Sequence, residues 1–76
     1  MNKSLLLSYM VKNGDTQEEL AEAMGLSLSR LNAKINRRNG AMFNQAEIDF
    51  IFRRYKFTPN EIVNIFFAKP ISYQEV

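Results

Sequence analysis

The segment from Thr16 to Arg38 contains two helical patterns that are joined by only three residues, Gly25-Leu26-Ser27. Glycine readily adopts the left-handed backbone with which a helix often ends, and serine is a favoured N-cap for the helix that follows. Helices joined by so short a link must cross steeply, and Ala21 is small enough to lie where they approach. The link therefore predicts a steeply crossed pair of helices.

Patterns elsewhere in the chain indicate three more helices, and two of them repeat the start signal of the first crossed helix. A Thr or Asn followed three residues later by Glu, the pattern of a capping box, occurs at Thr16, Asn44 and Thr58. The expected helices cover residues 3–12, the Thr16 cap to Gly25, the Ser27 cap to 36 or 37, 45–55 and 59–68. No segment reads convincingly as a strand. We therefore expect an all-α, compact five-helix bundle, with one domain at residues 1–68 and a loose tail at residues 69–76.

The 76 residues include no cysteine and no histidine. A disulfide framework and a thiolate metal site are therefore excluded, and the usual general base is missing. Because the eight acidic residues form no obvious catalytic pair, we expect a protein that is not an enzyme, without catalytic residues, cofactor or metal. The apolar run Leu5-Leu6-Leu7 is too short for a signal peptide or a membrane span, so we expect a cytoplasmic protein that contacts no membrane.

The two crossed helices carry opposite charge. The first begins among four acidic residues, Asp15, Glu18, Glu19 and Glu22. From residue 23 to residue 46 all charged residues are cations, namely Arg30, Lys34, Arg37 and Arg38. The second helix is therefore suited to a polyanion, while the first keeps its glutamates turned away. A further cation, Arg53, follows Asp49 by four residues, which favours a surface ion pair.

The outward face of the second helix is polar and small. Leu31 and Ile35 point inward at i and i+4, which leaves five residues mostly outward: Ser29, Arg30, Asn32, Ala33 and Asn36. Side chains of these types read base edges or hold phosphates. The pair therefore has the signature of a helix-turn-helix, with residues 28–36 as the helix that enters a major groove.

Thr16 to Arg38 resembles the helix-turn-helix of the phage repressor and Cro family, the xenobiotic-response-element family of bacterial regulators. The matching residues are Thr16-Gln17, Glu19-Leu20-Ala21, Gly25, Ser27 and Leu31. The segments KSLLLSYMVKNGDTQEEL and FNQAEIDFIFRRYKFTPNEIVNIFFA are similar to small phage-associated regulators of Gram-positive bacteria, so the likeness covers almost the whole chain. It implies a lambda-repressor-like DNA-binding domain.

The resemblance also implies a role for each DNA-binding residue. Gln17 would bond a phosphate and brace a base-reading side chain. The first residues to enter the groove would be Ser27, Leu28 and Ser29, with Arg30 beside them, followed one turn later by Asn32 and Ala33. The residues that grip the backbone beyond the helix would be Asn36, Arg37 and Arg38.

Two positions depart from the family pattern. Many members have their second buried hydrophobe where this chain has Lys34, and Ile35 takes that role here. This leaves open whether Ala33 or Lys34 faces the groove. Leu28 is an unusual apolar residue at a base-reading position.

The helix expected at residues 59–68 is apolar nearly all round. A helix that covers a small bundle needs only one buried face, so the surplus predicts an exposed patch for a partner. The patch residues are Ile62, Val63, Ile65, Phe66 and Phe67. Because the repressors that the chain resembles commonly dimerise, we expect a homodimer that holds two second helices about 34 Å apart on a near-palindromic double-stranded operator.

Two functions fit these features. The first is a sequence-specific DNA-binding transcriptional regulator of phage or prophage type, either a repressor or a Cro-like antagonist, nucleoid-associated when it is bound to DNA. The second is a protein-interaction module, such as an antitoxin or an anti-repressor, that uses the apolar C-terminal helix.

Overall fold

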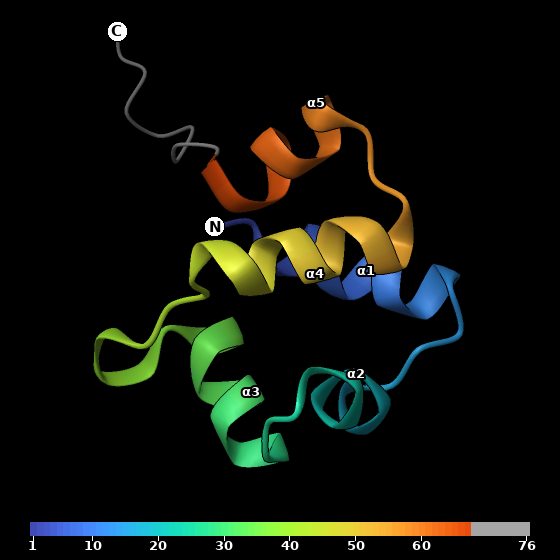
Figure 1. The fold of residues 1–76 in the computed structure, drawn as a ribbon. Coiled ribbons are helices and arrows are strands. Elements are labelled where there is room, and N and C mark those ends of the chain that lie inside the picture. Colours follow the sequence, from blue (N-terminus) through green and yellow to red (C-terminus); the bar gives the residue numbers. More distant parts are fainter. Residues whose placement is uncertain (68–76) are drawn as a thin grey trace, which may run out of the picture.

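The computed structural model describes residues 1–67, which form five helices and no strand (Figure 1). The helices are α1 (Lys3–Lys12), α2 (Gln17–Met24), α3 (Leu28–Asn36), α4 (Gln45–Tyr55) and α5 (Pro59–Ile62). A 3₁₀ turn, η1 (Arg38–Gly40), follows α3, and a π turn, η2 (Val63–Phe67), follows α5. Residue 68 and the tail predicted at residues 69–76 lie outside the described residues. In Figure 1, α4 separates α5 from the α2–α3 pair.

The helices begin at the caps that the sequence predicts. Capping boxes form at Thr16, Asn44 and Thr58, and the Ser27 hydroxyl accepts from the Arg30 amide at 3.1 Å. Gly25 ends α2 with a φ of 73°, a left-handed conformation that strains other residues. No helix among residues 1–67 is long and apolar enough to cross a bilayer.

A helix begins at Pro59 as predicted and continues to Phe67, but its hydrogen-bond pattern is not that of an α-helix throughout. The α-helical pattern ends at Ile62, and a π turn carries the chain on to Phe67. This wider turn accompanies the burial of two consecutive large side chains, Ile65 and Phe66. The Asn2 amide also donates to the Ile65 carbonyl at 2.6 Å, which ties η2 to the start of α1. The departure from α geometry therefore lies where the chain packs against α1, and caps alone do not reveal it.

Every helix except α5 contributes to one apolar core, and η2 contributes in its place. The buried residues are Leu6, Met10, Leu20, Ala21, Leu31, Ile35, Phe43, Ile51, Tyr55, Phe57, Ile65 and Phe66. Edge-to-face contacts join Tyr9 to Phe57 and Phe43 to Phe66, with ring centroids 4.7 and 5.8 Å apart. Ala21 is 2% exposed, as the steep crossing of α2 and α3 requires.

A charged cluster joins the start of α2 to the end of α4. Arg54 donates through Nε and Nη2 to the two carboxylate oxygens of Asp15, at 2.8 and 2.9 Å, and the Tyr55 hydroxyl donates to the same carboxylate. The Asp15 side chain is only 9% exposed. The guanidinium therefore holds the pKa of Asp15 below its ordinary value, and burial, together with the carboxylate, raises the pKa of Tyr55. On the outer face of α4, the predicted pair of Arg53 and Asp49 forms at 2.9 Å.

The depressed pKa of Asp15 predicts that the protein loses stability in acid. A carboxyl group whose pKa is lower in the folded state stabilises the fold above its unfolded pKa, about 4, and loses that contribution as the pH falls through the folded pKa. Asp15→Asn should lower the free energy of unfolding at pH 7 by about 2 kcal/mol and flatten its decline below about pH 5. Urea titrations at a series of pH values measure both effects.

Glu22→Gln is the control, since it removes one exposed carboxylate from α2 and should keep the decline in acid. If the free energy of unfolding fell equally steeply with decreasing pH in Asp15→Asn and in the wild type, Asp15 would not be the source of the loss of stability in acid. The hydrogen bond from Tyr9 also lowers the pKa of Glu61. Because Glu61 is present in every variant, part of the loss of stability in acid should remain in all of them.

Candidate nucleic-acid interface

One long side of α3 is open to solvent. Leu31 and Ile35 point into the core at 0% and 2% exposure, as the sequence predicts. All ten residues predicted to contact DNA are at least partly exposed to solvent. Seven of them are exposed, namely Ser27, Leu28, Ser29, Arg30, Asn36, Arg37 and Arg38, and three are partly exposed, namely Gln17, Asn32 and Ala33.

A chain of side-chain amides joins three helices across this face. The Asn32 Nδ2 group donates to Gln17 Oε1 at 2.7 Å, which links the start of α2 to the middle of α3. Asn36 Nδ2 donates to both the backbone carbonyl and the side-chain oxygen of Asn32, each at 2.9 Å. At the outer end, Lys3 of α1 donates to Asn36 Oδ1 at 2.9 Å. Gln17 therefore braces Asn32, and α1 joins the site through Lys3.

Lys3 is the residue of this site that sequence reasoning missed. It stands 33 residues before its partner Asn36, so no local spacing connects the two. Its one sequence signal is a cation at the first position of a helix whose N-cap is Asn2. A cation is unfavourable at a helix N-terminus, and its place there suggests a role beyond the stability of α1.

The chain leaves α3 in a turn that holds one cation, one amide and one glycine in left-handed conformations. Arg37 has a φ of 53° and Asn39 a φ of 52°, and Gly40 follows at 80°. Arg38 Nη2 approaches Asn32 Oδ1 at 3.4 Å. None of the ion pairs that form within residues 1–67 involves Arg30, Arg37 or Arg38. Positive charge therefore collects, without intramolecular neutralisation, at the end of α3.

Lys34 turns away from this open side. Its ammonium group pairs with Glu47 of α4 at 3.0 Å and donates to the Met42 carbonyl at 3.2 Å, and its side chain is 15% exposed. The burial of Ile35 sets the rotation of α3 that directs Lys34 to α4. Of the two residues that the sequence left undecided, Ala33 is the one whose side chain has no such partner.

The C-terminal apolar residues divide between the core and the surface. Ile65 and Phe66, which the sequence assigned to a dimer surface, are core residues at 0% and 9% exposure, so for these two that assignment was wrong. Val63 and Phe67 remain 52% and 60% exposed, and Ile62 is partly buried. The reason is the size of the bundle, since so few residues need both side chains to complete the core.

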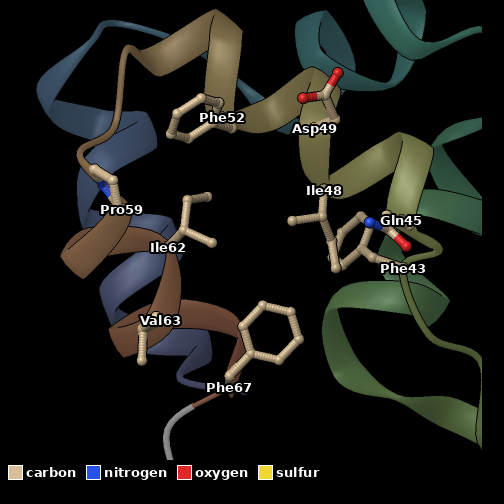
Figure 2. A pocket seen from close by; sticks show the side chains of 9 residues that line it. All are labelled: Phe43, Gln45, Ile48, Asp49, Phe52, Pro59, Ile62, Val63 and Phe67. Carbon is tan, nitrogen blue, oxygen red and sulfur yellow. The ribbon is translucent and has the colours of Figure 1, made fainter.

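An apolar groove lies beside the exposed Val63 and Phe67. Figure 2 shows side chains of α4 on one side and of α5 and η2 on the other, facing a common space of about 660 Å³. The lining residues are Phe43, Gln45, Ile48, Asp49, Phe52, Pro59, Ile62, Val63 and Phe67. The surface available to a partner is therefore formed by α4 as well as by the C-terminal segment.

Comparisons with protein-family models, with curated proteins and with solved structures found no match for this chain.

The pairing of Lys34 and Glu47 predicts unequal effects of removing the two partners. Glu47→Ala should cost about 2–3 kcal/mol of stability, because it deletes the capping box of α4 and leaves a partly buried ammonium without its carboxylate. Lys34→Met should cost at most about 1 kcal/mol, since Glu47 keeps its hydrogen bond from the Asn44 amide and the new side chain is apolar. Urea denaturation of both variants tests this order, and equal losses would contradict it.

Proposed function

We propose that this protein is a sequence-specific DNA-binding transcriptional regulator, a repressor or a Cro-like antagonist of phage type. In this proposal the α2–α3 pair is a helix-turn-helix of lambda-repressor type, and α3 enters the major groove. The steep crossing at Gly25, the buried pair Leu31 and Ile35 and the exposed opposite face support that geometry.

The observation that carries the proposal is the distribution of paired and unpaired cations. Lys34, Arg53 and Arg54 are paired with carboxylates of the same chain, whereas Arg30, Arg37 and Arg38 form no ion pair within residues 1–67. Lys3, Lys12 and Lys56 also form no ion pair within this range. What distinguishes Arg30, Arg37 and Arg38 is that they lie together on the exposed side of α3 and in the turn after it. A row of such cations matches the phosphates that flank a major groove.

Within the proposal, some residues of α3 contact base edges and the N-cap of α3 contacts a phosphate. Ser29, Asn32 and Ala33 face base edges, where the small Ala33 allows close approach to a thymine methyl group and the exposed Leu28 offers a second apolar contact. The Ser27 oxygen is engaged in the cap of α3, but its hydroxyl hydrogen can still donate to a phosphate.

The apolar groove supports the second part of the proposal, a homodimer. Val63 and Phe67 are large, exposed and adjacent to a hollow of matching chemistry, so a second copy can bury them. A two-fold dimer would set two α3 helices about 34 Å apart, one turn of DNA. Binding across a promoter would then repress it by occlusion.

The same groove favours the alternative, a protein-interaction module such as an antitoxin or an anti-repressor. An amphipathic helix from another protein fits a hydrophobic groove in the same way as a second copy does. The two functions differ in one measurement, because only the regulator retards duplex DNA from a random pool at low salt and micromolar protein concentration.

Arg37→Gly separates stability from DNA binding. Glycine relieves the left-handed strain at this position, so the variant should be more stable by a few tenths to about 1 kcal/mol. It should nevertheless bind DNA more weakly, and the slope of log K against log salt should fall in magnitude by about 0.9. Thermal denaturation and a salt series of binding isotherms provide the two readouts.

Lys56→Gly is the matched control. Lys56 ends α4 with a φ of 55°, so this substitution also relieves a left-handed residue, and it also removes one positive charge. It should gain similar stability and leave the salt slope unchanged. If neither variant changes the slope, Arg37 makes no phosphate contact, and equal changes would show that the position of Arg37 after α3 gives it no special role.

Phe67→Ser tests the dimer. Because Phe67 is 60% exposed, its loss should hardly change the unfolding of the monomer, but it should weaken self-association at least about tenfold. Val11→Ser on α1, at a residue 78% exposed, is the control and should leave association unchanged. Sedimentation equilibrium measures both, and an unaltered dimer in Phe67→Ser would place the interface elsewhere.

A further inference from the structure

Cations at two points determine how every amide of the α1–α2–α3 chain is oriented. Lysine and arginine side chains can only donate hydrogen bonds. Lys3 therefore meets the oxygen of Asn36, which turns Asn36 Nδ2 toward Asn32. Arg38 and Asn36 both meet the oxygen of Asn32, which turns Asn32 Nδ2 toward Gln17. The last acceptor, Gln17 Oε1, is used by Asn32, and Gln17 Nε2 remains at the end.

The result is that Asn32 presents only a donor, because its side-chain oxygen already accepts two hydrogen bonds, whereas the oxygens of Gln17 and Asn36 each accept one and keep a second lone pair. The side-chain oxygens of Gln17, Asn32 and Asn36 all accept from within the protein. The hydrogens that have no acceptor in the described part of the chain are one on Asn32 Nδ2, both on Gln17 Nε2 and two on Lys3 Nζ. A ligand atom that bonds to the Asn32 side chain must therefore be an acceptor.

This polarity matters for the reading of bases. An asparagine that recognises adenine uses both of its side-chain atoms, since it donates to N7 and accepts from the N6 amino group. In this structure the Asn32 oxygen is occupied by Asn36 and Arg38. Guanine offers two acceptors in the major groove, N7 and O6, and cytosine offers a donor. Asn32, whose oxygen is engaged, can offer only an N–H group to a base, and together with the N–H groups of Gln17 Nε2 this matches the two acceptors of guanine.

We propose that Lys3 is a positioning residue that orients Asn36, Asn32 and Gln17 so that the site selects guanine over adenine at the base beside Asn32. The inference rests on the proposed DNA-binding function and adds a specificity to it. Lys3 acts at a distance through hydrogen bonds, and its own two free N–H groups face solvent, where a phosphate can also bind them.

The test compares Lys3→Met, Lys3→Arg and, as a control at the other end of the same helix, Lys12→Met. The probe is the duplex that the wild-type protein selects from a random pool, together with single-base variants of it. The wild type should prefer guanine over adenine about tenfold at one position, and Asn32→Ala should abolish that preference. Lys3→Met should reduce the same preference severalfold, while Lys3→Arg and Lys12→Met retain it.

If Lys3→Met lost affinity equally for all duplexes, the inference would be overturned, because Lys3 would then contact a phosphate without any effect on specificity. A wild-type preference for adenine at the Asn32-dependent position would overturn it as well. In both cases the proposed function would stand.

A readout without DNA separates the two proposals. The side-chain amide resonances of Asn36, Asn32 and Gln17 report their hydrogen bonds in the free protein. Lys3→Met should shift all three, and Lys3→Arg should preserve them, since arginine is also a donor without an acceptor. A change confined to Asn36 would show that Lys3 does not orient the chain. Absence of DNA binding by a wild type with the expected shifts would refute the proposed function and with it the preference for guanine, while the orientation of the amides by Lys3 would stand.

Discussion

The link Gly25-Leu26-Ser27 is the constraint on which the rest of the structure depends. Gly25 ends α2 in a left-handed conformation. The Leu26 amide donates to the Ala21 carbonyl at 2.9 Å, so this carbonyl at the end of α2 has a hydrogen-bond partner. Ser27 then caps α3 at once. The rotation of α3 that buries Leu31 and Ile35 leaves residues of its opposite side exposed or partly exposed.

Helix α4 determines which charges remain available to a ligand. It supplies Glu47 to Lys34, Arg54 to Asp15 and Asp49 to Arg53, and these three pairs are the ion pairs within residues 1–67. The first two also attach both halves of the α2–α3 unit to the bundle. The cations in these pairs are neutralised by carboxylates. Arg37 and Arg38, in the turn that leads away from α3, have no carboxylate partner within residues 1–67. Folding and the electrostatics of the proposed site thus depend on the same contacts.

Much of the fold could be predicted from the sequence because its signals are local. A capping box involves residues three apart, so Thr16, Asn44 and Thr58 mark their helices without any knowledge of tertiary structure. The assignment of Lys34 could not be predicted, since it depends on where Glu47 of α4 lies. Lys3 is a stronger example, because its partner is 33 residues away. The π turn at Val63–Phe67 likewise follows from packing against α1, which leaves no pattern in the adjacent residues.

The small core explains why the exposed apolar groove spans two elements. A bundle of this size has too few apolar residues to leave a whole helix for association, and Ile65 and Phe66 are needed inside. The exposed remainder, Val63 and Phe67, is too narrow alone, and α4 supplies the other wall of the groove through Ile48 and Phe52. Association at this groove therefore depends on the packing of α5 and η2 against α4. Val63 and Phe67 are the exposed large apolar residues of this groove, so substitutions there alter it with the least effect on the core.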